Sequence, residues 1–399
     1  MNWLFVTTRF PWPLVDGHWL RVYHLIRALR ESGDEVAIVS FEGDEDGKAA
    51  YASLGVRFAG GLEGTHQSRG PARVRLGPYA FDQRMAEAVR REAAGFDVVV
   101  LSGARMLQYA PEAARPGAVI ADFIDDPVLE YGRRGATPRS ARERLRRWKN
   151  RLGRRRYERR FLAFVETVTF VSDEDCGSFL LRHPAASATC IPNGVDVEFF
   201  QRPQNLPRDG AGRSTVVFTG HMSNPNNARA AIFLVREVAP HLWPRRPETQ
   251  VRIVGADPSK EVLALAAKRV EVTGRVEDVR PYLWDASVVA IPMQSGTGIK
   301  NKLLEAWAAG AAVVATPLAC QGVPAEDGRN LLLADAADAF AGRLLALLDD
   351  KALRARLGKA GYDTVLDRFT WDSAAARLRS FSHVKPGLPA GSLSFSSPE

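Results

Sequence analysis

The sequence predicts an α/β protein made of two doubly wound parallel-sheet domains. Short β-rich runs alternate with helical stretches, and the same alternation starts again after a turn-rich stretch near the middle of the chain. The 399 residues are enough for about two domains, each with its own core. With 46% hydrophobic and 25% charged residues, the composition excludes a disordered, collagen-like or purely coiled-coil protein.

The first domain is expected over residues 1–194. Its predicted strands are Trp3–Thr8, Glu35–Phe41, Asp97–Ser102, Ala118–Phe123, Thr167–Ser172 and Ala188–Ile191. Apolar residues recur every three positions over Trp19–Arg30, which predicts a helix between the first two strands. Residues 195–212 contain two prolines and are the expected linker.

The second domain is expected over residues 213–368. Its predicted strands are Thr215–Thr219, Gln250–Val254, Val270–Thr273, Ser287–Ile291, Ala311–Ala315 and Asn330–Leu333. Its predicted helices are Asn226–Trp243, Pro258–Lys268, Val279–Trp284, Lys300–Ala309, Ala336–Leu348 and Ala352–Leu366. A helix over 369–382 is a candidate to cross back to the first domain, and 383–399, rich in Pro, Gly and Ser, is expected to be disordered.

The cysteines and the N-terminal stretch bear on the compartment. Cys176, Cys190 and Cys320 are an odd number without metal-ligand spacing, so neither a disulfide framework nor a zinc site is expected. The start, MNWLFVTTRFPWPL, has no basic region, and no run of 18 uncharged apolar residues follows. The sequence therefore predicts neither secretion nor a membrane span, and a cytoplasmic location is expected.

The positive charge is concentrated in one segment. Residues 133–160 hold 14 Lys and Arg but only two acidic residues, so the rest of the chain is net negative. Apolar side chains three to five residues apart predict a helix over 140–165 with one buried side and arginines on the other. Three interpretations stay open: a solvated helix packed on its own domain, a peripheral contact with the anionic inner face of a membrane, and a nucleic-acid contact, which no accompanying motif supports.

The strongest local signal joins GHMSNPNN, residues 220–227, to SGTGIKNKLLEAWAAGAAVVATP, residues 295–317. Two glycines follow a predicted strand there, and Lys300 and Lys302 begin the next helix, a combination that favours phosphate. Glu305 follows on the same helix, where a carboxylate can accept hydrogen bonds from the two hydroxyls of a ribose. The alternative is a solvated helix start with a surface glutamate.

In their order along the chain, IPNGVD (191–196) and KLLEAWAAGAAVVAT (302–316) resemble glycosyltransferase family 4, also called glycosyltransferase group 1. FVTTRFPWP (5–13) and FTGHMSNPNN (218–227) more closely resemble the sugar transferases associated with PEP-CTERM and exopolysaccharide systems. The resemblance implies the GT-B fold, with two Rossmann-like domains that face each other across a cleft. It implies transfer of a sugar from a nucleoside diphosphate donor to a hydroxyl acceptor with retention of configuration, in polysaccharide or glycoconjugate biosynthesis, without a metal or other cofactor.

The resemblance also implies the site. The expected donor-binding residues are Gly17, Gly220, His221, Gly296, Thr297, Gly298, Lys300, Lys302, Leu304 and Glu305. Glu305 matches the second Glu of the family's Glu-(seven residues)-Glu motif, whereas the position of the first Glu is occupied by Thr297. Because that first Glu would contact the hydroxyls of the transferred sugar, the sequence does not indicate which sugar is transferred. The loop 220–227 also lacks the Arg and Lys that the family uses for the diphosphate. We therefore expect Lys300 and Lys302, with the helix start near Asn226, to balance that charge.

Acceptor-side groups are expected in the first domain. Asp122, Asp125 and Asp126 follow a predicted strand, where carboxylates can deprotonate a hydroxyl or bind a cation. We take Asp125, with Lys300 and Lys302, as a candidate catalytic residue that orients the acceptor. The alternative is that Asp125 and Asp126 cap the segment from Pro127, as Asp16 can cap the helix near Gly17.

Other functions stay open at this point. They are a degenerate transferase that acts as a binding or scaffold protein through the basic helix, another GT-B enzyme such as a UDP-sugar epimerase or an inverting transferase, and an α/β nucleic-acid-binding protein. The sequence has no GxGxxG after its first strand, which weighs against a dinucleotide oxidoreductase.

Overall fold

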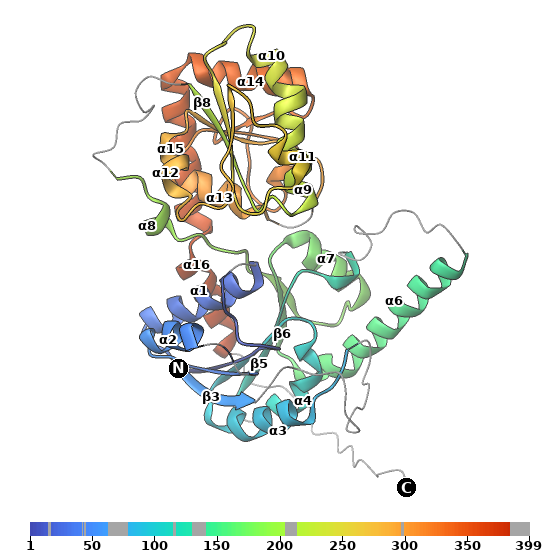
Figure 1. Cartoon of the computed structure of the whole chain (residues 1–399). Helices are drawn as coiled ribbons and strands as arrows, with labels where there is room; N and C mark the ends of the chain where they lie inside the picture. The colour runs from blue at the N-terminus through green and yellow to red at the C-terminus, as the bar shows by residue number, and fades with distance from the viewer. Residues whose placement is uncertain are drawn as a thin grey trace.

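Two α/β lobes lie one above the other in the computed structural model (Figure 1). It describes residues 1–14, 17–41, 43, 45–62, 79–114, 117–129, 141–203, 214–296 and 299–383. Within those ranges, a seven-stranded sheet has the order β3-β2-β1-β4-β5-β6-β7, and a six-stranded sheet has the order β10-β9-β8-β11-β12-β13. Neighbouring strands pair in parallel. The predicted doubly wound α/β architecture is confirmed.

The first lobe contains one strand more than the sequence predicted. Its strands are β1 Asn2–Val6, β2 Glu35–Phe41, β3 Arg57–Leu62, β4 Val98–Ser102, β5 Ala118–Ile124, β6 Thr167–Phe170 and β7 Ala188–Cys190. Its helices are α1 Gly17–Glu31, α2 Glu45–Ser53, α3 Gln83–Glu92, α4 Ala110–Ala113, α6 Ala141–Phe161 and α7 Asp173–Arg182. The strand β3 escaped prediction because it is an edge strand that contains two glycines and buries one residue only.

The second lobe follows the predicted alternation more closely. Its strands are β8 Thr215–Thr219, β9 Gln250–Val254, β10 Val270–Val272, β11 Val288–Ile291, β12 Val313–Ala315 and β13 Leu332–Leu333. Its helices are α9 Pro225–Phe233, α10 Ala239–Leu242, α11 Lys260–Leu263, α12 Arg280–Asp285, α13 Asn301–Ala308, α14 Ala337–Asp349 and α15 Lys351–Arg368. A π-helical turn, Leu234–Val238, joins α9 to α10, so the predicted helix over 226–243 is interrupted. The helix predicted over 258–268 is limited to α11.

The chain crosses between the lobes twice, and the two crossings touch. After α15, helix α16 (Trp371–Arg379) returns to the first lobe and packs beside α1 in the core on one face of the first sheet (Figure 1). Beside it, the Val195 N–H donates to the Phe369 carbonyl at 2.7 Å. A Cβ on Gly194 would lie 2.5 Å from the Trp371 nitrogen. The segment IPNGVD thus needs its glycine because the returning chain occupies the space of a side chain.

Helix α6 departs from the prediction of a single buried side. Tyr157 and Phe161 are buried, but Leu145 and Trp148 are 52% and 59% exposed. At 3.6 residues per turn, Trp148 points away from the face that carries Tyr157. The reason is visible in Figure 1, where the N-terminal part of α6 projects beyond the lobe. Among the described helices, none has both the length and the apolar character that crossing a membrane requires.

Helix α13 is held in the second lobe by close packing around Trp307. This side chain is fully buried, and its Nε1 donates to the Asn330 carbonyl at 3.1 Å. Gly361 of α15 faces the indole, and a Cβ there would lie 2.6 Å from Trp307 Nε1. The close approach of α15 therefore determines where α13 lies relative to the sheet.

We predict that Gly361→Ala lowers the free energy of unfolding by about 1–3 kcal/mol relative to Gly342→Ala, because its methyl group overpacks the Trp307 site. Both glycines are helical, and a Cβ on the exposed Gly342 would meet nothing within 4 Å, so the pair cancels the effect of helix propensity. Urea unfolding followed by circular dichroism measures the difference. Equal stability of the two variants would contradict the packing described.

Candidate functional site

A cavity of about 1380 Å³ opens at the carboxyl ends of the second-sheet strands. Because β8 pairs in parallel with β11, the loop after β8 and the segment that leads into α13 lie at the same edge. These two segments line the cavity together with the start of α9. From the first lobe, Leu14, Gly17 and Leu20 complete the lining, so the cavity lies between the lobes. This is where open parallel sheets bind ligands.

Lys302 lies beneath this cavity, with its ammonium group against the loop after β8. Its Nζ donates to Asn227 Oδ1 at 2.6 Å and lies 4.5 Å from the centre of the Phe218 ring. A Cβ on Gly220 would lie 2.9 Å from that Nζ and from Asn227 Nδ2, so a side chain at this position would displace the Lys302–Asn227 pair. Burial lowers the pKa of Lys302 to about 7. An anion bound here would favour the charged form.

Glu305 lies one helical turn after Lys302 and also lines the cavity. Burial raises the pKa of its carboxyl group, and the neighbouring Lys302 acts in the opposite direction. Among the described residues, its carboxylate has no hydrogen-bond partner. An acceptor-only group of this kind suits a ligand that brings hydroxyl donors.

His221 lies at the rim of the cavity and is exposed. Its Nδ1 is 2.8 Å from Ser223 Oγ, and its Nε2 is 3.1 Å from Asp257 Oδ2. Both ring nitrogens are therefore engaged by neighbours. The backbone carbonyl of His221 accepts a hydrogen bond from Asn227 Nδ2 at 2.9 Å and so helps to orient the Asn227 side chain.

Sequence reasoning missed several polar groups that line the cavity. They are Asn227, Arg229, Arg275 and Ser295. The motif NPNN does contain a signal for a helix start, because Asn224 caps α9 and Pro225 occupies its first turn. The side chains of Asn226 and Asn227 therefore lie in the first turn of a helix at the edge of the sheet. One partner of each, Ser295 for Asn226 and Lys302 for Asn227, lies in the other segment, 69 and 75 residues away, which local patterns do not reveal.

The remaining predicted site residues are spread more widely. Gly17 begins α1 and lines the cavity, as do Gly220, Gly296 and Lys300. Leu304 is fully buried in the core of the second lobe. Thr297 and Gly298, like Asp16, lie outside the described residues.

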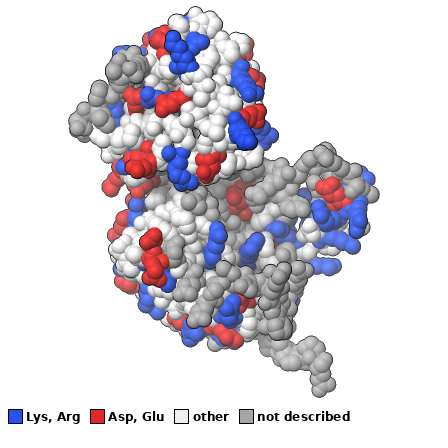
Figure 2. All heavy atoms as spheres, viewed as in Figure 1, with Lys and Arg blue, Asp and Glu red and all other residues white. Residues whose placement is uncertain are grey.

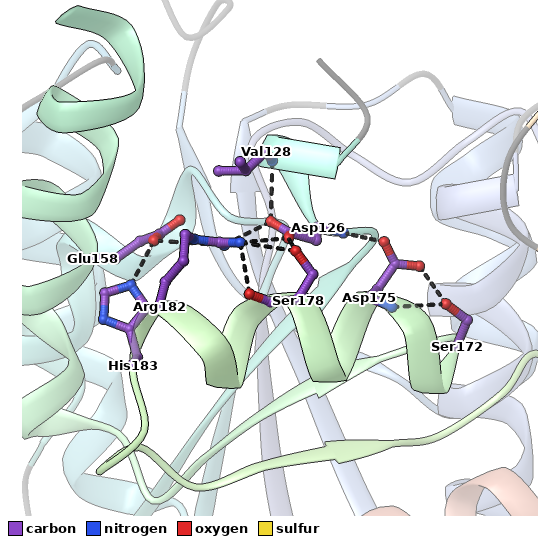
Figure 3. Close-up of polar contacts among 8 residues, drawn as sticks. All are labelled: Asp126, Val128, Glu158, Ser172, Asp175, Ser178, Arg182 and His183. Carbon is purple, nitrogen blue, oxygen red and sulfur yellow. Dashed lines mark hydrogen bonds and ion pairs between the residues drawn. The ribbon is translucent and has the colours of Figure 1, made fainter. Parts of the chain in front are cut away.

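The three aspartates after β5 have different surroundings. Asp122 is buried and ion-paired with Arg21 at 2.9 Å. Asp126 is fully buried and accepts from Arg182 Nη1 at 2.7 Å, Ser178 Oγ at 2.6 Å and the Val128 N–H at 3.0 Å (Figure 3). Asp125, between them, is half-buried and is not among the lining residues of the cavity. Asp122 and Asp126 thus hold the lobe together, which agrees with the capping alternative for Asp126.

The Asp126 cluster also joins α6 to the sheet. In Figure 3, Arg182 of α7 points from Asp126 toward Glu158 of α6, 3.8 Å away, and His183 Nε2 lies 2.8 Å from the same carboxylate. The C-terminal half of α6 is therefore fixed to the loop after β5. Among the described residues, no group of three His, Cys, Asp or Glu side chains is arranged to hold a metal ion.

Two protein-family models match the chain. The model described as "Glycosyltransferase Family 4" matches residues 15–199, and "Glycosyl transferases group 1" matches residues 213–350. A phosphatidyl-myo-inositol mannosyltransferase of Mycobacterium tuberculosis H37Rv is 31% identical over 207 residues, covering 48% of this chain and 53% of the relative. The lipopolysaccharide core biosynthesis glycosyltransferase LpsE of Rhizobium meliloti is 28% identical over 192 residues, covering 44% and 56%. The chain thus spans about half the length of the curated relatives it matches.

Solved structures share the whole architecture at low sequence identity. Anabaena Alr3699/HepE in complex with UDP superposes with a TM-score of 0.68 at 16% identity, covering 95% of this chain and 99% of that chain. Sucrose-phosphate synthase from Thermosynechococcus elongatus gives 0.65 at 18% identity, covering 95% and 97%. These likenesses concern the fold, and they confirm the predicted GT-B arrangement.

We predict that affinity for nucleotide sugars falls as the pH rises from about 6 to about 9, because Lys302, with a pKa of about 7, loses its proton over that range. Calorimetric titration with UDP-glucose and GDP-mannose measures this, since their diphosphates, unlike free UDP, do not titrate near pH 6. The variant Lys302→Arg, which stays charged, is expected to flatten the profile. An affinity in the unmodified protein that does not change with pH would remove Lys302 from the phosphate contact.

Proposed function

Since the chain belongs to the glycosyltransferases of family 4 and group 1, whose models match its two halves, we propose that it transfers a sugar from a nucleoside diphosphate donor to a hydroxyl acceptor. The donor binds mainly to the second lobe, and the acceptor enters from the first. The observation that carries the proposal is the meeting of Lys302, Lys300 and Glu305 in one cavity between the lobes.

The cavity chemistry matches the two polar parts of such a donor. Lys302, held by Asn227 under the glycine of the β8 loop, and Lys300 balance the diphosphate. Glu305, whose carboxylate lacks a partner among the described residues, accepts hydrogen bonds from the ribose hydroxyls. Because burial is costly for both the Lys302 ammonium and the Glu305 carboxylate, ligand groups that bind them stabilise the complex.

Transfer proceeds with retention of configuration. The acceptor oxygen forms a bond to the anomeric carbon on the face from which the diphosphate departs, and the acceptor proton passes to the leaving phosphate oxygen. This scheme needs no strong protein base, so the chain contributes positioning and stabilisation of the departing charge. Asp125, which does not line the cavity, has no role in this scheme. No metal or other cofactor takes part.

The acceptor is a hydroxyl of a lipid-linked molecule at the inner face of the membrane, where the protein is peripherally bound from the cytoplasm. One relative is named a phosphatidyl-myo-inositol mannosyltransferase, which motivates a lipid. Helix α6 supplies the contact. Leu145, Trp148 and Leu152 follow one face of α6 at helical spacing. Figure 2 shows Lys and Arg side chains gathered on this projecting part of the molecule. Exposed apolar residues within a basic surface are typical of helices that bind anionic bilayers.

We expect the double variant Lys300→Ala, Lys302→Ala to abolish transfer, because the departing diphosphate loses both cations, and Glu305→Ala mainly to weaken donor binding, by roughly tenfold. The assay is release of UDP or GDP from a panel of nucleotide sugars, with and without lipid acceptors, and NMR of the product gives its anomeric configuration. Lys260→Ala, Lys268→Ala, two exposed lysines outside the cavity lining, is the matched control. Transfer at the unmodified rate in the Lys300, Lys302 variant would refute the phosphate assignment.

We predict that the protein co-sediments with vesicles that contain phosphatidylglycerol and not with purely zwitterionic vesicles. Trp148→Ala, Leu145→Ser should reduce binding by roughly tenfold or more, because two exposed apolar side chains leave the interface. Leu181→Ser, which changes a side chain on α7 that is 88% exposed, is the control. Equal loss in both variants, or binding that does not depend on anionic lipid, would contradict the role of α6.

A further inference from the structure

Ile124, at the end of β5, has a backbone conformation that isoleucine rarely adopts. Its φ is 73°, and among the described residues only Ile124 and Asp257 combine a positive φ with a side chain. An aspartate tolerates this region, whereas a β-branched side chain clashes with its own backbone there. The conformation of Ile124 is therefore strained, and such strain persists only where the surroundings enforce it.

A β-bulge accompanies the strained residue. The register of β5 against β6 shifts between Asp122 and Ile124, so Phe123 is an extra residue in β5. The Ile124 carbonyl accepts from the Val171 N–H at 2.9 Å, so pairing with the neighbouring strand resumes directly after the bulge. Bulges of this kind change the direction in which a side chain points, and they are frequent next to active sites.

Two buried aspartates hold the ends of the strained segment. The Asp122 carboxylate accepts from Arg21 Nε at 2.9 Å and Nη2 at 3.0 Å, and its carbonyl accepts from the Gly103 N–H at 2.7 Å. Four residues later, the Asp126 carboxylate is held by Arg182, as Figure 3 shows. The chain between the two aspartates therefore cannot relax without breaking a buried ion pair.

Core packing does not explain why the strain is kept. Ile124 is half-buried and belongs to neither of the two hydrophobic cores on the faces of the first sheet, whereas the preceding Phe123 is part of one of them. A side chain that served only the fold would be expected in a core and in a relaxed conformation. Strain without a gain in core packing is typical of functional sites.

The strained residue lies where the first lobe meets the second. In the sheet, β5 lies between β4 and β6. At the end of β4, Ser102 Oγ is 2.8 Å from the ring of His18, which follows the cavity-lining Gly17. At the end of β6, Ser172 Cβ is 3.8 Å from where a Cβ on Gly322 of the second lobe would lie. The end of β5, between these two places, therefore borders the space between the lobes.

We propose that Ile124 is a specificity-determining residue for the acceptor, and that its strained backbone holds the side chain against the C–H groups beside the reacting hydroxyl. The inference rests on the proposed function, because it assigns a contact of the same acceptor. Ile124 does not line the donor cavity. Only the reacting hydroxyl of the acceptor has to enter that cavity, so the rest of the acceptor binds to the first lobe outside it.

The stability of two variants tests the strain. We expect Ile124→Gly to unfold at a temperature about 1–4 °C higher than Ile124→Ala, because glycine adopts a positive φ without strain. Leu263→Gly and Leu263→Ala are the matched pair, since Leu263 is exposed, lies on α11 and has no positive φ. There the alanine variant should be the more stable one. The same order at both positions would overturn the strain at Ile124.

Steady-state kinetics with saturating donor and varied acceptor test the contact. The acceptors are vesicles that contain phosphatidylinositol, diacylglycerol or monoglucosyl diacylglycerol, and the one that the unmodified protein uses best serves for the variants. We expect Ile124→Gly and Ile124→Ala to raise the acceptor KM about tenfold, whereas Ile124→Val, which keeps a β-branched apolar side chain, changes it by less than about threefold. If Ile124 were only structural, the more stable glycine variant would also be the more active one.

Calorimetric titration with UDP-glucose and GDP-mannose, and with free UDP and GDP, covers the donor side, where no variant should differ from the unmodified protein. Leu263→Ala should keep the unmodified acceptor KM. An unchanged acceptor KM in both Ile124→Gly and Ile124→Ala overturns the inference, and the proposed function stands. A loss of nucleotide-sugar affinity relative to the free nucleotide also overturns it, because Ile124 would then contact the transferred sugar. If none of the lipids accepts a sugar, the lipid-linked acceptor of the proposed function fails, and this inference fails with it.

Discussion

The short contact between the Lys302 ammonium and the Asn227 amide is the interaction on which the rest of the site depends. It joins α13 to α9 across the edge of the second sheet, and it holds a cation where the backbone has no side chain in the way. On the side of α13 that faces the core, Trp307 packs against α15 and bonds to Asn330. The positions of Lys302 and Glu305 on α13 therefore depend on core packing and not on the preceding loop. A buried charge of this kind is costly unless something compensates it, so a bound anion would stabilise it.

The fold could be predicted because its strands are nearly continuous apolar runs, as expected when helices cover both faces of a parallel sheet. The exceptions have physical reasons. Strand β3 buries one residue only and lies at an edge, and α6 has apolar residues at helical spacing of which Leu145 and Trp148 are exposed. The spacing of apolar residues predicts that a helix has an apolar face, but it does not predict which part of that face is buried against the rest of the protein.

The candidate site could be predicted only in part. Glycines, lysines and a glutamate close together in sequence indicated phosphate and ribose, and the structure brings Lys300, Lys302 and Glu305 into one cavity. The direction in which Asn226 points could not be foreseen, because it follows from Ser295, which is distant in sequence, and from the donor-only nature of Arg229. Nor could the aspartates after β5 be told apart, since their differences come from Arg21 and Arg182 on other helices.

The two segments that connect the lobes, one at Gly194 and the other at Trp371, are in contact with each other. Because the two crossing segments are hydrogen-bonded and closely packed, the lobes are joined at this place by two connected stretches of chain and not by a single linker. Gly17 and Lys300 line the same cavity from opposite lobes, so their separation depends on the angle at which these crossing segments join the lobes. Gly194 thus contributes to the geometry of a cavity that it does not itself line.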